Sequence, residues 1–226
     1  MKISKNKKKI LENIDFNKTY EPLEAIKILK EKSYVKFDET VDVSINLNID
    51  SNKTDQNIKG VVNLPKGSGK KVNVAVVASD EKLNDAKENG ADLVGSAEII
   101  DTIASNKIDF DILIATPDMM PHLGKIAKVL GPKGLMPNPK LGTVTTDIAK
   151  AVKDIKTGLV EIRNDKDGNL SSTIGRKSFS TEKLLENYKH FIESVKKEKP
   201  ETIKGEFIKS IFISSTMGIS YKVGAK

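Results

Sequence analysis

The sequence predicts a mixed protein of two domains, an α+β domain assembled from both ends of the chain and an α/β domain inserted into it. The 226 residues carry 38 Lys and Arg against 31 Asp and Glu, and the excess divides as +3 in residues 1–66, zero in 67–157 and +4 in 158–226. Ten of the eleven Phe and Tyr also lie outside 67–157. Insertion at a surface loop brings the flanking segments together, which explains both distributions. Three consecutive segments of a single domain are the alternative.

Residues before 67 are expected to form two helices and two strands. Pro22–Tyr34 has a proline suited to the first turn of a helix and an apolar face at helical spacing, and Lys5–Ile14 reads as another helix. Residues 41–49 alternate without exception between Val, Ile or Leu and Asp, Ser or Asn, which predicts a strand with one buried and one solvent-facing side. Asn57–Leu64 is the second expected strand.

After residue 157 the sequence predicts a hairpin, a long helix and two strands. Leu159–Arg163 and Leu170–Ile174 flank a turn, Asn164–Gly168, whose Asp-Gly ending favours a hairpin. The helix Ser180–Lys197 begins at a hydroxyl cap, carries Glu early and Lys late, and precedes Pro200. The last strands are expected at Phe207–Ser214 and Ile219–Val223.

The middle segment alternates between short apolar strands and helices, a pattern typical of a parallel sheet covered on both faces. The expected strands are Val72–Ala78, Asp92–Val94, Phe110–Ala115 and a short one at Thr143–Val144. The expected helices are Asp80–Glu88, Ser96–Ala104, Asp118–Leu130 and Thr146–Ile155. The two junctions, Pro65–Lys71 and Lys156–Gly158, are rich in turn-forming residues.

The composition excludes several classes of function. Without cysteine the chain has no disulfide framework, thiolate metal site or cysteine nucleophile, and two histidines, His122 and His190, leave little for a metal centre. The longest apolar run, Val74–Ala78, is far too short to span a bilayer, and no apolar segment follows the basic Met1–Lys9 as in a secretory signal. A cytoplasmic protein without metal, cofactor or membrane contact is expected.

The motifs of nucleotide-binding enzymes and hydrolases are incomplete. Gly67–Lys70 resembles the end of a phosphate-binding loop, but Leu64 stands in place of the first glycine and Lys71 in place of the magnesium-binding Ser or Thr. Ala78–Asp80 replaces the glycine-rich turn of a dinucleotide site, and no G-x-S-x-G sequence occurs. The chain is therefore not expected to be an enzyme, although no spacing singles out or excludes a carboxylate pair.

The placement of cations and hydroxyls indicates a polyanion-binding surface. The chain has only two arginines, Arg163 and Arg176, and both fall beside the expected hairpin, where planar guanidinium groups suit phosphates or base edges. Ser214–Gly218 places hydroxyls and a thioether at a strand end. Phe37 either stacks on a base or packs in the core. Solubility of the sheet edge is the alternative for the arginines.

A second basic region lies in the middle segment. Residues 119–146 contain four lysines and no acid, whereas 80–118 hold ten acids and three lysines. The acid-free stretch includes Gly131–Lys140, where three prolines and two glycines fix an irregular loop that presents backbone amides and the ammonium groups of Lys133 and Lys140. A contact with RNA and a rigid connector between helix and strand both fit this loop.

Five short motifs occur together in the order and spacing of one family: Lys36–Thr40 (KFDET), Asp55–Asn57 (DQN), Gly131–Lys140 (GPKGLMPNPK), Arg163–Lys166 (RNDK) and Ser215–Gly218 (STMG). Over essentially its whole length the chain resembles the bacterial ribosomal protein L-one family, whose members form the mobile stalk of the large ribosomal subunit. The resemblance implies a discontinuous ferredoxin-like split β-α-β sandwich with an inserted small Rossmann-like parallel α/β domain.

The resemblance also implies partners. The discontinuous domain, 1–66 plus 158–226, is expected to bind large-subunit ribosomal RNA, and the stalk to assist release of deacylated tRNA from the exit site. Free protein of the family is monomeric and represses its own operon messenger RNA, which is a further expected partner. An enzyme acting on a nucleotide through 67–157 and an interaction scaffold without RNA are the rival classes.

Carried over position by position, the implied RNA contacts are Lys36, Phe37, Glu39, Thr40, Arg163, Asn164, Asp165, Lys166, Ser210, Thr216, Met217 and Gly218, with Lys133 and Lys140 as secondary contacts. Two positions depart from the family pattern. Ser171 stands where many relatives carry histidine, and Lys133 stands where they often carry arginine. Contacts that need an imidazole or a bidentate guanidinium are therefore not expected there.

Overall fold

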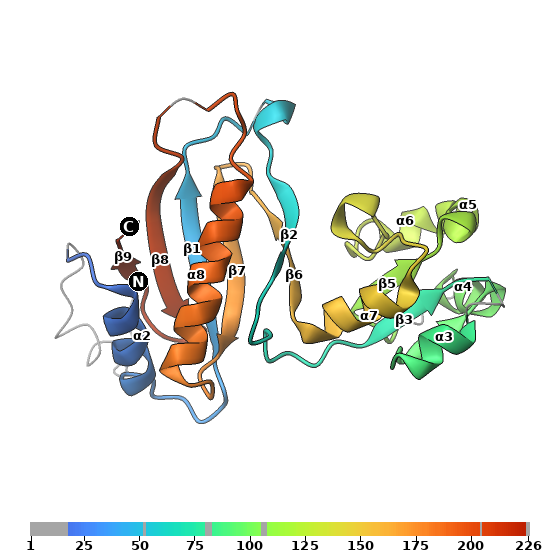
Figure 1. The fold of residues 1–226 in the computed structure, drawn as a ribbon, viewed down its shortest axis with the longest axis horizontal. Helices are drawn as coiled ribbons and strands as arrows, with labels where there is room; N and C mark the ends of the chain where they lie inside the picture. Colours follow the sequence, from blue (N-terminus) through green and yellow to red (C-terminus); the bar gives the residue numbers. More distant parts are fainter. Residues whose placement is uncertain (1–17, 52, 80–82, 105–107, 204, 225–226) are drawn as a thin grey trace, which may run out of the picture. The chain divides into compact units, whose positions relative to one another are not determined.

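The structure, a computed structural model, describes residues 18–51, 53–79, 83–104, 108–203 and 205–224 (Figure 1). The chain forms two compact units. The discontinuous unit contains the chain up to Gly69 and from Gly158 onward, and the inserted unit is Lys70–Thr157. The helix predicted at Lys5–Ile14 lies outside the described residues.

The discontinuous unit is built on a four-stranded antiparallel sheet with the strand order β7-β1-β8-β9. Its strands are β1 (Thr40–Leu47), β7 (Asn169–Arg176), β8 (Ile208–Ser215) and β9 (Tyr221–Val223). β7 and β8 pair with β1 from opposite sides, and the helix α8 (Thr181–Lys197) connects them along the chain. This is a split β-α-β arrangement, and it confirms the predicted ferredoxin-like class.

Two helices cover one face of this sheet. α2 (Pro22–Glu31) and α8 contact each other and pack on β8 and β7 (Figure 1). Every second residue of β1 points into the core beneath them, with Val41, Val43 and Ile45 wholly buried. Burial of each such side chain stabilises the fold by about 1.5–3 kcal/mol, so the alternation in the sequence decides which side of β1 faces the helices. The opposite side of β1 stays half-exposed along its whole length.

The start of α8 follows from its cap. The Ser180 side-chain oxygen accepts a hydrogen bond from the backbone N–H of Lys183 at 3.3 Å, which satisfies one of the free amides of the first turn. Leu184, Phe191 and Val195 then face the core, all wholly buried. The helix therefore begins and ends within a residue of its predicted bounds.

The predicted hairpin is wrong in its pairing. β6 (Leu159–Arg163) and β7 flank the turn as expected, but β6 pairs with β2 (Lys59–Asn63) in a separate two-stranded sheet, while β7 pairs with β1. Only an isolated bridge between Asn164 and Leu170 joins the two strands next to the turn. The Asp-Gly signal fixes the turn, in which Gly168 has a φ of 77°. The strand partners depend on distant segments that bury each strand's apolar side.

The inserted unit contains a three-stranded parallel sheet with the order β4-β3-β5. Its strands are β3 (Val74–Val77), β4 (Leu93–Gly95) and β5 (Ile112–Ala115), and its helices include α3 (Leu83–Glu88), α4 (Ala97–Ala104) and α7 (Ile148–Thr157). All four residues of β3 are buried, as expected for a central strand with helices on both faces. The parallel α/β class predicted for this segment is confirmed.

Two predicted elements of the inserted unit differ from the structure. The helix expected over Asp118–Leu130 is divided at Ile126, whose ψ of 10° departs from helical geometry. The resulting pieces are η3 (Pro117–Met119), α5 (Met120–Lys125) and α6 (Ala127–Leu130). Pro121 and Gly124 weaken helix propensity just before the break. Thr143–Val144 forms only an isolated bridge, from Ala115 to Val144, and no strand.

A buried asparagine fixes the end of the first segment of the discontinuous unit. The Asn187 side chain, wholly buried on α8, accepts from the backbone N–H of Lys66 at 3.0 Å and donates to the Gly67 carbonyl at 2.9 Å and to a carbonyl of β7. These bonds attach Lys66 and Gly67 to α8 and β7. Gly158, at the return of the chain, has a φ of 126°, and a Cβ there would lie 2.6 Å from the Gly67 Cα.

Candidate nucleic-acid interface

The face of the four-stranded sheet that lies away from the helices is lined by polar side chains. We call it the open face. It contains Thr40, Asp42, Ser44 and Asn46 of β1, Asn169, Ser171 and Thr173 of β7, Ser210, Phe212 and Ser214 of β8, and Lys222 of β9. These residues are register neighbours, and each is half-exposed or exposed. Because β1 lies between β7 and β8, its polar positions form the middle of this surface.

One end of the open face is formed by two segments that lie far apart in the chain. We call Tyr34–Thr40 together with Thr216–Gly218 the turn end. The Thr216 hydroxyl accepts from the Thr40 backbone N–H at 3.1 Å and lies 2.8 Å from the Thr40 hydroxyl. The Thr216 backbone N–H in turn donates to the Thr40 carbonyl at 3.2 Å. Both strand ends are therefore tied to each other by main-chain and side-chain bonds.

Glu39 holds the turn from below. Only 1% of its surface is exposed, and its carboxylate accepts from the Met217 backbone N–H at 3.0 Å and from the Ser33 hydroxyl at 2.5 Å. The Lys177 ammonium donates to the same Ser33 hydroxyl at 2.7 Å. Glu39 therefore supports the turn from within the protein, since its carboxylate is enclosed and its hydrogen bonds face inward, and the RNA contact expected of it stays a prediction.

Apolar side chains are exposed at the turn end. Phe37 is 53% and Met217 49% exposed, unusual values for large apolar residues, and Tyr34 donates from its hydroxyl to the Met217 carbonyl at 3.4 Å. Lys36, next to Phe37, is exposed as well. At Gly218 a Cβ would collide with the Ser215 hydroxyl, so the turn needs glycine there. The structure therefore brings the predicted residues of this end together.

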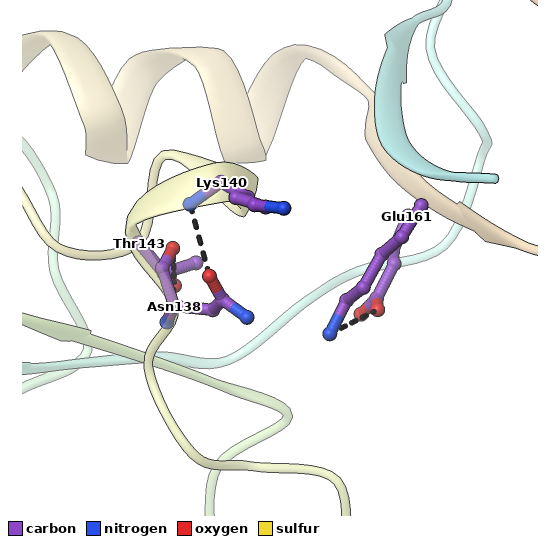
Figure 2. Close-up of polar contacts among 5 residues, drawn as sticks. Asn138, Lys140, Thr143 and Glu161 are labelled. Carbon is purple, nitrogen blue, oxygen red and sulfur yellow. Dashed lines mark hydrogen bonds and ion pairs between the residues drawn. The ribbon is translucent and has the colours of Figure 1, made fainter. Parts of the chain in front are cut away.

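The opposite end of the open face carries the other predicted group. We call Asn57–Lys59 together with Arg163–Lys166 the hairpin end. With Ser51 these segments line an open hollow of about 540 Å³. The Arg163 and Lys166 side chains are exposed there, while Lys59 pairs with Glu161 at 3.7 Å (Figure 2). The hollow is thus lined by three cationic side chains and the Asp165 carboxylate, and the exposed Arg163 and Lys166 are suited to phosphate groups.

Asn164 and Asp165 shape this end through their side chains. The Asn164 carbonyl oxygen accepts from the Ile58 backbone N–H at 2.7 Å, which ties the turn to the segment before β2. The Asp165 carboxylate accepts from the backbone N–H of Asn169 at 2.7 Å and of Asp167 at 2.9 Å. These backbone donors, Asn169 first, hold the pKa of Asp165 below its usual value, since they favour the charged form. Both side chains are engaged by the turn itself.

Ser210 connects the hairpin end with the open face. It lies opposite Asn46 in the sheet and lines a second hollow, of about 390 Å³, that also reaches Asp165. The two arginines, in contrast, do not lie together. Arg176 is the register partner of Thr40 and donates to the Asp38 carbonyl at 3.1 Å, so it belongs to the turn end. The prediction that both flank the hairpin is corrected, because β7 runs the length of the sheet between them.

Comparison with protein families shows where this chain belongs. A profile of the Ribosomal protein L1p/L10e family matches residues 29–219. The chain belongs to this family. Members are structural, non-enzymatic proteins of the large ribosomal subunit that bind ribosomal RNA. The matched range contains every predicted contact residue at both ends of the open face.

The family's proline-glycine loop lies in the inserted unit. The Asn138 side chain accepts from the Lys140 backbone N–H at 2.9 Å, and the Thr143 hydroxyl bonds both the N–H and the carbonyl of Asn138 (Figure 2). Lys133 and Lys140 are exposed. The loop backbone is therefore held by internal hydrogen bonds, and its two ammonium groups are exposed. Both the interpretation as an RNA contact and the interpretation as a rigid connector are compatible with this structure.

The sequence analysis missed several residues of this surface. Ser44, Asn46, Asn57, Lys59 and Asn169 line its two hollows but were assigned no role. A signal was present, because the polar positions of the 41–49 alternation had to face one side of the sheet.

The part of the chain that the structure describes contains neither a membrane-spanning helix nor a metal-binding cluster. No helix in that part of the chain is long and apolar enough to cross a membrane. No group of three or more His, Cys, Asp or Glu side chains in the same residues is placed to hold a metal ion.

Proposed function

We propose that the discontinuous unit binds large-subunit ribosomal RNA across the open face and its two ends. One observation carries the proposal: the contact residues implied by the family, although spread from Lys36 to Gly218, gather at the two ends of one polar sheet face. Arg163 and Lys166 supply charge at the hairpin end, and Lys36 supplies it at the turn end. Phosphate contacts of this kind provide affinity and fix the orientation of the RNA.

The turn end supplies the selectivity of this interaction. Its backbone is held before RNA arrives, since Glu39, Thr40 and Ser33 already satisfy the polar groups of the turn. An ordered turn loses little conformational freedom on binding. Phe37 and Met217 offer exposed apolar surface on which unstacked bases of a folded RNA pack. Shape and exposed bases, rather than a regular duplex, are therefore recognised.

The finer roles implied by the family are part of the same proposal. The protein is a ribosome-bound, cytoplasmic constituent of the mobile stalk, and it assists release of deacylated tRNA from the exit site. As a free monomer it uses the same surface to bind its own operon messenger and repress translation. Lys133 and Lys140 of the inserted unit make secondary RNA contacts. The protein acts without catalysis and without a cofactor.

The test is a filter-binding titration of the full chain with a transcript of the large-subunit ribosomal RNA at several salt concentrations. Neutralisation of about five phosphates gives a log–log slope near −4, and the variants Arg163→Ala and Lys166→Ala each reduce its magnitude by about one. Lys189→Ala, an exposed lysine of α8 away from the open face, serves as the matched control and leaves the slope unchanged. A slope near zero, or equal effects of all three variants, contradicts the proposal.

A further inference from the structure

The middle of the open face differs chemically from its ends. Between Thr40 and Asn169 the described side chains of β1 and β7 are hydroxyls and amides, with one carboxylate, that of Asp42, and the Asp165 carboxylate lies beside Asn169 in the hollow of about 390 Å³. The aromatic ring of Phe212 and, at the β9 edge, Lys222 complete this part of the surface. We call Asp42, Ser44, Asn46, Asn169 and Ser171 the central strip.

Hydrogen bonds between strands order the central strip. The Ser44 and Ser171 hydroxyls lie 3.0 Å apart, and the Asn46 amide donates to the Asn169 carbonyl oxygen at 2.7 Å. A hydroxyl has one donor and two acceptor sites, and an amide has two of each, so each pair keeps capacity for a ligand after bonding its neighbour. Apart from Asp42, the strip therefore presents fixed, uncharged donors and acceptors along β1 and β7.

Asp42 makes this strip unfavourable for phosphate. Its carboxylate accepts from the Thr173 hydroxyl at 2.7 Å and from the Thr40 hydroxyl at 3.3 Å. Among the residues that the structure describes, no lysine or arginine forms an ion pair with it. A carboxylate compensated only by hydroxyls repels a phosphate placed above it but accepts hydrogen bonds from neutral donors. Ribose hydroxyls, base amino groups and base imino groups are such donors.

We propose that the central strip reads ribose 2′-hydroxyls and base edges, and that Asp42 keeps the phosphates of the bound RNA at the two ends of the open face. The inference rests on the proposed function, since it concerns how the same surface distinguishes its RNA. The 390 Å³ hollow along Ser44, Asn46, Ser171 and Ser210 is the place of contact, with Phe212 beside it for base packing. Neutral hydrogen-bonding pairs such as Ser44–Ser171 can recognise the ribose hydroxyls, whereas phosphate contacts carry no information about the sugar.

The experiment is nucleotide interference mapping with the full chain. Transcripts of the large-subunit ribosomal RNA carry sparse, random 2′-deoxy substitutions, and the bound fraction is sequenced to locate the hydroxyls that binding requires. Wild-type protein is expected to show a small set of such positions. In the double variant Ser44→Ala, Ser171→Ala some of these positions lose their effect, affinity falls about tenfold, as for one lost net hydrogen bond, and the salt slope stays unchanged. Ser44→Thr, Ser171→Thr retains both hydroxyls and restores the pattern.

A second variant tests the part played by Asp42. Asp42→Asn keeps the size of the side chain and removes the charge, so it is expected to bind unrelated RNA several-fold more tightly and with a steeper salt slope, while cognate RNA gains less. Binding of the transcript without any 2′-deoxy interference, or an unchanged pattern in the Ser-to-Ala variant, overturns this inference and leaves the proposed function intact. Failure of the wild-type chain to bind the transcript overturns both. If the Ser-to-Ala variant fails to fold, the wild-type interference map and the binding of Asp42→Asn still test the inference.

Discussion

Replacement of Glu39 by glutamine tests whether the turn end is organised before RNA binds. Glutamine keeps the length of the side chain and can still accept from the Met217 backbone N–H. Its amide N–H₂ group, however, is a donor where the Ser33 hydroxyl now donates, so the bond to a charged carboxylate is lost and at most a weaker bond between neutral groups replaces it. The Ser33 oxygen already accepts from Lys177. The change therefore removes one short hydrogen bond to a charged group at a site that is 1% exposed.

The expected magnitude follows from that one bond. A hydrogen bond to a charged group contributes about 1.5–3 kcal/mol, so Glu39→Gln should lower the free energy of unfolding by about 2 kcal/mol. For a chain of this size the unfolding midpoint then falls by roughly 4–8 °C. Affinity for the RNA transcript should fall as well, because the Thr216–Gly218 turn loses part of its support. The salt slope should stay the same, since Glu39 contacts no phosphate.

Urea unfolding of the free protein and filter binding at two salt concentrations measure these quantities. Ser33→Ala is the companion variant, because it removes the same bond from the other side and should give a similar loss. Glu193→Gln, an exposed residue of α8, controls for the chemical change and should have no effect. An unfolding free energy for Glu39→Gln equal to that of wild type would refute the reasoning.

Three further predictions concern other parts of the chain. Asp165 has a lowered pKa in the folded protein, so the stability that its turn supplies is present above a pH of about 3.8 and is lost as the pH falls from there through the folded-state pKa. The amide NMR shifts of Asp167 should report this titration, and Asp165→Asn should abolish it. Asn187→Ala leaves the buried Ile174 carbonyl and the part-buried backbone groups of Lys66 and Gly67 without their side-chain partner and should cost about 3 kcal/mol in urea unfolding, whereas an exposed control, Lys189→Ala, should cost less than about 0.5. A shortened chain with a Gly-Ser linker in place of the inserted unit should retain most of the RNA affinity, and a loss of more than a hundredfold would place essential contacts in that unit.

Local patterns in the sequence predict the elements of this fold well. The strict alternation of residues 41–49 gives β1 and the side of it that faces the helices, because only one register buries all of its apolar side chains. The cap at Ser180 and the apolar spacing that follows give α8. The apolar run at Val74–Val77 gives the buried central strand of the inserted unit. Each of these signals lies within the element that it predicts.

The features that the sequence did not reveal depend on contacts between distant segments. β6 pairs with β2 and not with its sequence neighbour β7, and this pairing depends on residues about a hundred positions away in the chain. Glu39 was expected to be a contact residue because it belongs to the family motif Lys36–Thr40, yet its hydrogen-bond partner Met217 lies 178 residues further on. Propensity and spacing carry no information on such pairs. The sequence therefore allowed us to predict which residues form the two ends of the open face, but not how those residues are arranged in space.

The register of β1 joins the stability of this fold to its proposed function. Val41, Val43 and Ile45 are wholly buried, and the residues between them form the open face. A slip of one residue would bury Asp42 and Ser44 and expose the core, so the packing that stabilises the sheet also decides which groups lie on the open face. The irregularities in strand pairing occur only near the ends of β1, between Val41 and Asp42 toward β7 and between Asn46 and Leu47 toward β8. The strip between them is regular, which is why exchanging hydroxyls on its exposed side should alter recognition while leaving the core intact.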